Sequence, residues 1–238
     1  RQGSQQQTRA AQAFEKVIAE NKIAPAVPTP DAIARLPQKD GSLQATVSGE
    51  RVVFKDVKTK DWFAYFVYKV AEGGIVSGYK SAEGKLTGRY GPANPVLRSE
   101  LLKMVMEAAK VNLKDHPGTP RNQSARGQWS SAYAKAAEDL GLSVYVPEVD
   151  ISKPATRGEV VQTVLEALHM PIGNHRADFS DVPLAHPYTN AIGIAAFLGI
   201  VSGDADAAGK PTGKFRPEDS ITRAEVAKII SLATDLMR

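Results

Sequence analysis

Three arginines in a recurring motif are the residues whose types and spacing best suggest chemistry. Arg223 lies in Ile-Thr-Arg-Ala-Glu, Arg157 in Ala-Thr-Arg-Gly-Glu and Arg98 in Val-Leu-Arg-Ser-Glu. Each motif precedes an apolar run with helical spacing, so each arginine is expected in the first turn of a helix. A guanidinium group beside backbone N–H groups that lack an intrahelical partner favours binding of a carboxylate or phosphate. The motif therefore indicates an anion site that occurs three times.

The threonine and the glutamate of the motif have a purely structural explanation. Thr222 and Glu225 have the spacing of a capping box, in which each side chain binds the other residue's backbone N–H. The second copy repeats this arrangement, and Leu97 breaks it in the first. Such a cap stabilises a helix by about 1 kcal/mol. A cap places no demand on the arginine, for which the alternative explanation is an internal ion pair, for example with Asp56 or Asp181.

The chain consists of three related units. Phe-x-Asp-Val at 54–57 recurs at 179–182, and Gly-Ile-Val-Ser-Gly at 74–78 recurs at 199–203 with the same offset. The middle copy keeps the tryptophan and the helix-ending glycine of the first copy, but its loop is shorter. A repeated unit that carries the same cation suggests a multivalent binder of anions more readily than a single-site enzyme.

Each unit is expected to contain two helices joined by a glycine-containing loop. The first helices are expected at 62–72, 129–140 and 187–198, and the second helices begin at the motif and run through 101–111, 160–168 and 226–236. Because helices alternate with loops and β-branched alternation is scarce, the pattern predicts an all-α fold with short strands allowed in the loops. The units are placed at 54–112, 121–170 and 179–238.

Residues 1–50 differ from the rest of the chain. An amphipathic stretch at 11–21 predicts a short helix, and four prolines then predict an extended lead-in with a helical turn at 31–35. The stretch 43–53 fits a strand or a loop. We interpret residues 1–50 as a lead-in that lies over the domain; the alternative is an arm that joins the core or pairs with another chain.

Two tryptophans occupy matching positions at the start of the first helices. Trp62 and Trp129 are explained either as core residues or as platforms that stack against the apolar face of a sugar ring. The loops that follow these helices carry Gly78-Tyr79 and Gly203-Asp204. Their glycines are interpreted as conformational, although they also allow a ligand to approach the backbone closely.

The composition excludes several classes of function. The 238 residues include no cysteine, which rules out disulfides, thiolate metal sites and cysteine nucleophiles. The four histidines lack metal-ligand spacing, and no catalytic motif is present, so we expect no enzyme activity, metal or cofactor. The longest strongly apolar stretch is about half the length of a membrane-spanning helix. The net charge of +4 is only a mild basic bias, and we expect no nucleic-acid partner.

The ordered motifs resemble the surface-layer homology (SLH) family. Phe-x-Asp-Val, an aromatic residue or proline, Gly-Ile-Val-x-Gly, Phe-x-Pro and Ile-Thr-Arg-Ala-Glu follow one another nearly throughout the third unit. The first unit matches well, and the second matches only from Trp129 through Glu159. The resemblance covers about three quarters of the chain.

The resemblance implies a pseudo-threefold assembly, with one helix per unit at the centre and grooves between three lobes. It also implies that these grooves bind a secondary cell-wall polysaccharide, typically through a pyruvate ketal on N-acetylmannosamine. The motif arginines would then meet the ketal carboxylate. Because the second loop is short, Pro187 replaces a tryptophan and Asp204 replaces Tyr79, we expect one or two competent grooves rather than three.

The sequence therefore predicts an extracellular anchor that holds a surface or S-layer protein noncovalently at the bacterial cell wall. Its partners would be a pyruvylated polysaccharide and, in addition, other S-layer subunits. The alternative is a module with the same fold that serves protein–protein assembly of the envelope. The candidate ligand-binding residues are Arg98, Arg157, Arg223, Trp62, Trp129, Asp56, Asp181, Gly78, Tyr79, Gly203 and Asp204.

Overall fold

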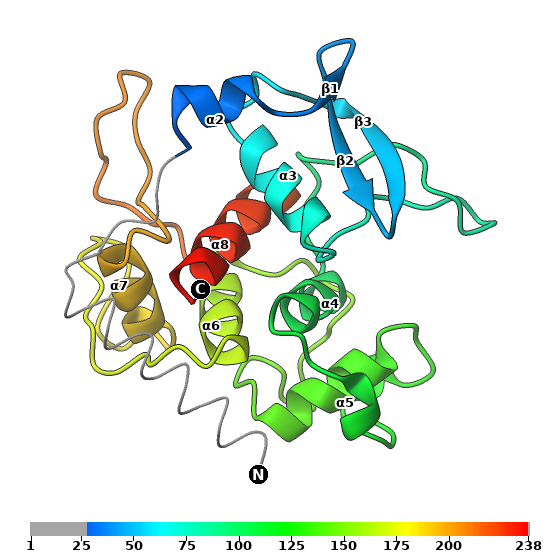
Figure 1. Cartoon of the computed structure of the whole chain (residues 1–238). Coiled ribbons are helices and arrows are strands. Elements are labelled where there is room, and N and C mark those ends of the chain that lie inside the picture. Colours follow the sequence, from blue (N-terminus) through cyan, green and yellow to red (C-terminus); the bar gives the residue numbers. More distant parts are fainter. Residues whose placement is uncertain (1–27, 238) are drawn as a thin grey trace.

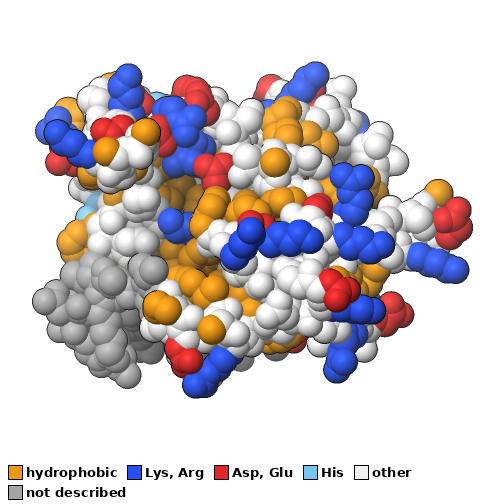
Figure 2. All heavy atoms as spheres, turned by 90° about the horizontal axis from the view of Figure 1, so that it is seen from above, with side chains coloured by type: hydrophobic (Ala, Val, Ile, Leu, Met, Phe, Trp, Pro, Cys, Tyr) orange, Lys and Arg blue, Asp and Glu red, His pale blue; other side chains and the backbone are white. Residues whose placement is uncertain are grey.

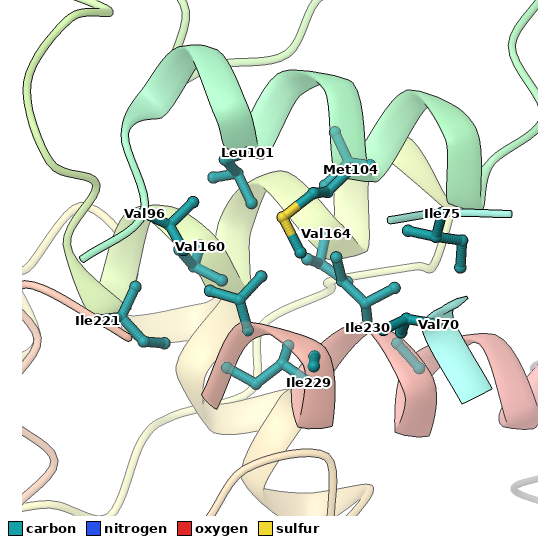
Figure 3. Packing of buried hydrophobic residues seen from close by; sticks show 14 of the residues in the cluster. Val70, Ile75, Val96, Leu101, Met104, Val160, Val164, Ile221, Ile229 and Ile230 are labelled. Atoms are coloured by element: carbon teal, nitrogen blue, oxygen red, sulfur yellow. The ribbon is translucent and has the colours of Figure 1, made fainter. Parts of the chain in front are cut away.

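Three helices that begin at the repeated motif meet at the centre of the molecule (Figure 1). They are α4 (Arg98–Ala108), α6 (Arg157–Ala167) and α8 (Arg223–Leu236) in a computed structural model that describes residues 28–237. Their apolar side chains point toward one another, with Met104 of α4, Val164 of α6 and Ile230 of α8 among them (Figure 3). Burying each such side chain contributes about 1.5–3 kcal/mol. The core therefore ties the three units together.

The first helix of each unit packs outside this centre, against the central helix of a different unit. These outer helices are α3 (Ala64–Glu72), α5 (Ser131–Leu140) and α7 (Thr189–Phe197). Helix α5 packs on α4, α7 packs on α6, and α3 packs on α8. Each central helix therefore packs against the outer helix of the next unit along the chain. The central helix of the third unit packs against the outer helix of the first, so the arrangement is cyclic.

A ring of backbone hydrogen bonds closes the same cycle just before the central helices begin. Val96 donates its N–H to the carbonyl oxygen of Ile221 (3.1 Å), Ile221 donates to Ala155 (3.4 Å), and Ala155 donates to Val96 (2.8 Å). Buried backbone N–H groups require partners, and here each unit supplies the partner for another. The ring and the helix exchange together describe a pseudo-threefold arrangement.

The structure has a helix at each of the six predicted positions, with ends that differ from the predicted ones by up to about three residues. Thr156 and Thr222 cap α6 and α8 with complete capping boxes. The Leu97 side chain has no hydrogen-bond acceptor, so the first unit has only one of the two capping-box hydrogen bonds. In this bond the backbone N–H of Leu97 donates to the Glu100 side chain (2.9 Å). The glycines that end or follow the first helices adopt positive φ angles, as a left-handed helix end requires; they are Gly74, Gly141 and Gly199.

The expectation of an all-α fold is wrong. The chain forms a three-stranded antiparallel sheet in the order β1 (Gln38–Lys39), β2 (Ser42–Val47) and β3 (Glu50–Lys58). The remaining elements are α2 (Pro30–Ala34), which confirms the helical turn, and single 3₁₀ turns at η1 (Leu113–Asp115) and η2 (Gln123–Ala125). The helix expected at 11–21 lies outside the described residues.

Two tight turns explain why this sheet forms. Asp40-Gly41 and Ser48-Gly49 all have positive φ angles, the geometry of two-residue hairpin turns. Between the turns, alternate residues of β2 are buried, including Leu43 and Ala45. The stretch 43–53, which fits a strand or a loop, forms most of β2 and the start of β3, because the turn at Ser48-Gly49 divides it. Strand β3 continues into Phe-x-Asp-Val of the first unit, so the hairpin crosses the boundary drawn near residue 50.

Candidate ligand-binding grooves

Each motif arginine binds the motif glutamate of another unit. The guanidinium of Arg98 donates two hydrogen bonds to the carboxylate of Glu159, at 2.7 and 2.9 Å. Arg157 donates to Glu225 at 2.8 Å. The third pair, between Arg223 and Glu100, is longer, at 3.6 Å. The ion-pair explanation of these arginines is therefore correct in kind, but the partners are the motif glutamates and not Asp56 or Asp181.

The backbone amides at these helix starts are not free. In α8 the N–H groups of Arg223 and Ala224 donate to the carbonyl oxygens of Asn94 (2.9 Å) and Pro92 (3.0 Å), in the loop of the first unit. The first two amides of α4 and α6 are bound in the same way by the loops of the second and third units. The prediction that free helix-end amides help to bind an anion is thus wrong. An anion must instead be recognised by side chains.

One groove lies between α8 and the loop at 200–205 and has a volume of about 220 Å³. Arg157 of the second unit and Trp62 of the first unit line it together with Lys228 of α8. We call it the Trp62 groove. The Trp62 side chain is 56% exposed, so its ring is available to a ligand rather than part of the core.

The second groove lies between α4 and the loop at 75–79 and has a volume of about 160 Å³. Arg223 of the third unit, Trp129 of the second unit and Lys103 of α4 line it, and Trp129 is 60% exposed. We call it the Trp129 groove. The two grooves are lined by the same residue types, because a tryptophan, an arginine, a lysine and the motif glutamate occupy matching positions in both.

The exchange of outer helices explains why every unit contributes to each groove. Because α3 packs on α8, Trp62 just before α3 reaches the central helix of the third unit. The arginine comes from the remaining unit, across the central ring. The guanidinium groups lie over aromatic rings, with Arg157 at 4.8 Å from the Phe215 centroid and Arg223 at 5.0 Å from that of Tyr79, distances typical of cation–π contact.

Lys228 carries a charge that the described protein residues leave without a hydrogen-bonding partner. Its ammonium lies 6.0 Å from the centre of the Trp62 ring, and within residues 28–237 it makes no ion pair or hydrogen bond. Burial, and then the neighbouring charge of Arg157, lower the pKa of Lys228 below its ordinary value of 10.5. An anion placed beside Lys228 and Arg157 would offset the cost of burying the ammonium group and the repulsion between the two cations.

The corresponding position in the second unit has different residues and contacts. Arg98 gives a third hydrogen bond to the carbonyl oxygen of Asp150 (3.2 Å). Tyr145, 3% exposed, donates its hydroxyl to the carbonyl oxygen of Arg98 (3.0 Å). Gln162 replaces the groove lysine, and Pro187 replaces the tryptophan. The shortened loop thus brings a buried tyrosine close to the arginine, and Arg98 lines neither groove.

Comparison with known proteins identifies the repeated segments. The family model of the S-layer homology domain matches residues 53–102 and 178–227, which coincide with the first and third units. These two segments are S-layer homology domains. These domains are anchoring modules of S-layer and other surface proteins at the cell wall, and they bind rather than catalyse. The chain is thereby associated with the cell surface.

Two enzymes are similar to part of this chain. The exoglucanase XynX of Acetivibrio thermocellus is 37% identical over 86 residues, which are 36% of this chain and 7% of the enzyme. The amylopullulanase of Thermoanaerobacterium thermosulfurigenes is 35% identical over 86 residues, or 36% of this chain and 4% of the enzyme. The chain therefore matches only a small part of either relative.

The aspartates of the S-layer homology repeats serve the loops. Asp56 accepts the N–H groups of Tyr90 (2.9 Å) and Gly91 (2.8 Å). Asp181 accepts the equivalent pair of amides in the third unit, at 2.8 and 2.9 Å. Neither aspartate lines the Trp62 groove or the Trp129 groove. Each aspartate instead fixes a loop, and a backbone carbonyl oxygen of that loop accepts a hydrogen bond from a motif arginine.

The paired loop residues do line the grooves, at Gly78-Tyr79 in one and Gly203-Asp204 in the other. A β-carbon on Gly203 would approach the Lys214 carbonyl oxygen to 2.8 Å, so this position requires glycine. Arg216 binds both oxygens of Asp204, and this contact lowers the pKa of the Asp204 carboxyl group. The like charge expected to repel an anionic ligand is therefore already paired.

Sequence reasoning missed the two groove lysines. Lys103 and Lys228 each follow the motif glutamate by three residues, and this spacing places them on the same face of the helix. The repeat alignment contained the signal, because the second unit has Gln162 at this position. Within the described residues no helix has the length and apolarity to cross a membrane, and no cluster of side chains suits a metal ion.

Proposed function

We propose that this chain anchors a surface protein to the bacterial cell wall by binding an anionic, pyruvylated secondary cell-wall polysaccharide in the Trp62 and Trp129 grooves. The observation that carries the proposal is the unpaired ammonium of Lys228 beside Arg157, under an exposed tryptophan. A half-buried cation without an acceptor favours an anion that arrives from outside.

The two halves of each groove fit the two halves of such a ligand. The arginine and lysine suit the ketal carboxylate, because the hydrogen bonds of Arg157 use two of the five N–H donors that a guanidinium offers. The exposed face of Trp62 suits the apolar face of a sugar ring. Shallow grooves of this size fit one or two sugar residues of a chain that continues into solvent.

Two equivalent grooves also support anchoring. When both grooves bind one polymer, the second contact is intramolecular, and the overall affinity exceeds that of either groove without further contacts. We infer that the equivalent position near Arg98 does not contribute, because Gln162 and Pro187 stand where the two grooves have a lysine and a tryptophan. The functional stoichiometry is then two grooves per chain, in keeping with the expectation of one or two.

The test uses purified cell-wall sacculi before and after mild acid removal of the ketal. We expect the chain to bind untreated sacculi and to lose binding after acid treatment or at high salt. Trp62→Ala and Trp129→Ala should each weaken binding, and the double variant should abolish it. Leu184→Ala is the matched control, because Leu184 is an exposed apolar residue, at 63%, outside both grooves.

Two results would contradict the proposal. Undiminished binding to sacculi without the ketal would exclude the carboxylate as the recognised group. A double tryptophan variant that binds like Leu184→Ala would exclude the grooves as the binding surface. Circular dichroism of each variant shows whether the fold is retained.

A further inference from the structure

A separate cleft of about 680 Å³ lies between strand β3 and the loop at 80–88. The loop is held as a narrow hairpin, since Thr87 donates its N–H to Tyr79 (3.0 Å) and Ser81 donates to Lys85 (2.8 Å). It touches β3 where Lys55 donates its N–H to Gly88 (2.9 Å). Beyond this contact the hairpin diverges from the strand. We call the space between them the β3 cleft.

The β3 cleft is rich in cations. Arg51 and Lys55 line it from the strand, and Lys80 and Lys85 line it from the hairpin. Glu50 and Glu83 also line it, so cations outnumber acids by four to two. Within residues 28–237 none of the four cations makes an ion pair. Figure 2, which views the molecule from the sheet side, shows Lys and Arg side chains in a row across this face.

One edge of β3 is open toward the cleft. Strand β2 pairs with the other edge, with Ala45 opposite Val52 and Val47 opposite Glu50 across the two-residue turn. In such a hairpin every second residue turns its N–H and C=O groups away from the partner strand. Arg51, Val53 and Lys55 are these residues, but Gly88 occupies the edge at Lys55, so the open part of the edge is at Arg51 and Val53. The amides of Arg51 and Val53 have no acceptor among the described residues outside the sheet.

We propose that the β3 cleft binds an extended acidic peptide of a partner protein, which adds to the open edge of β3 as a further strand. Strand addition uses main-chain hydrogen bonds for affinity and alternate side chains for specificity. On the exposed face of β3 the order is cation, half-buried valine, cation, at Arg51, Val53 and Lys55. The matching peptide places an acid opposite Arg51 and an apolar residue opposite Val53, because opposite charges stabilise cross-strand pairs. A second acid two residues further on leaves the paired stretch and meets the cations of Lys55, Lys80 and Lys85.

This cleft is distinct from the two proposed glycan grooves. Five of the fourteen residues that line the cleft precede the segment that matches the S-layer homology model, so the β2–β3 hairpin adds about a third of the cleft to that segment. The third unit has an equivalent loop hairpin, bridged at Ala205 and Pro211, but alanine replaces Lys80 there. The interaction surface therefore belongs to this chain's first unit.

The experiment measures the fluorescence anisotropy of a labelled peptide, Ser-Glu-Ser-Val-Ser-Glu-Ser, with both ends blocked, mixed with the whole chain. We expect salt-sensitive binding, and a roughly tenfold loss of affinity in Arg51→Glu/Lys55→Glu. Lys114→Glu is the matched control, an exposed lysine outside the cleft. The double variant is expected to bind sacculi like the wild type, which separates failure here from failure of the proposed anchoring.

Two isomeric peptides test strand addition against simple charge attraction. Each carries one N-methyl group, on neighbouring amides that point in opposite directions in an extended strand. We expect one isomer to bind and the other not. Equal binding of both isomers would overturn the proposal. So would binding of polygalacturonate, but not of the peptide, in a manner abolished by Arg51→Glu/Lys55→Glu, because the cleft would then recognise an anionic glycan.

Discussion

Arg98 binds both carboxylate oxygens of Glu159, the residue that completes the N-terminal cap of the central helix of the next unit. One glutamate thus serves its own helix and a neighbouring unit together. The pair is largely buried, with 15% and 10% of the two side chains exposed. Equivalent arginine–glutamate contacts link the other units around the centre. The motif therefore joins neighbouring units and also begins a helix.

Removing the guanidinium of Arg98 should destabilise the fold. Arg98→Ala leaves the buried carboxylate of Glu159 without its charge partner, a change that costs about 3 kcal/mol or more. Urea unfolding followed by circular dichroism gives the free energy of unfolding. Arg35→Ala is the control, since Arg35 pairs with Asp31 on the surface and should cost less than about 0.5 kcal/mol. Equal losses in the two variants would show that the joint contributes nothing to stability.

The hydroxyl of Tyr90 should make stability depend on alkaline pH. Tyr90 is fully buried and donates to the carbonyl oxygen of Arg223 at 3.0 Å, and burial raises its pKa to about 12. The folded state therefore keeps a proton that the unfolded state loses above about pH 10, and stability falls as the pH rises through this window.

Tyr90→Phe isolates this contribution, because Phe215 occupies the equivalent position in the third unit. We expect the variant to be about 1 kcal/mol less stable near neutral pH, from the lost hydrogen bond. The difference should narrow between about pH 10 and pH 12. Urea unfolding at about pH 8 and about pH 11 measures it. A difference that stays constant would contradict the assignment of the raised pKa.

Gly78 should be intolerant of a side chain for two reasons that can be separated. Its φ angle is +75°, and a β-carbon would lie 2.7 Å from the Arg89 carbonyl oxygen and 2.8 Å from the Phe54 ring. Gly84 has a similar φ angle of +78° but open space around it. Gly84→Ala should cost about 1 kcal/mol from backbone strain, and Gly78→Ala clearly more. Similar melting temperatures for the two variants would argue against the close approach.

Lys228 should lower the stability of the free protein. Its folded-state pKa is depressed, first by burial, so the unfolded chain binds a proton more readily. The resulting loss of folding stability is present below the pKa of Lys228 in the folded state, and it disappears as the pH rises past 10.5, the pKa of Lys228 in the unfolded state. Lys228→Met should therefore raise the melting temperature near neutral pH, and the gain should shrink toward about pH 11. The exposed Lys114→Met serves as control; a gain without pH dependence would refute the explanation.

Features that depend on neighbours along the chain can be predicted from the amino-acid sequence. Caps at Thr156 and Thr222, positive φ angles at the helix-ending glycines and the apolar spacing of six helices follow from local backbone and side-chain geometry. The repeats added the equivalence of Trp62 and Trp129. The Asp40-Gly41 dipeptide is also a local signal for the sheet, because Asp-Gly favours a two-residue hairpin turn.

Which units contact one another depends on how the whole chain packs. The partner of Arg98 lies in the second unit, and the groove that Trp62 enters belongs to the third, because the outer helices exchange around a closed ring. No local rule fixes such pairings, since each depends on how distant segments bury their apolar faces together. The same packing places the buried Tyr145 against Arg98, so the three related arginines have different surroundings in the folded chain.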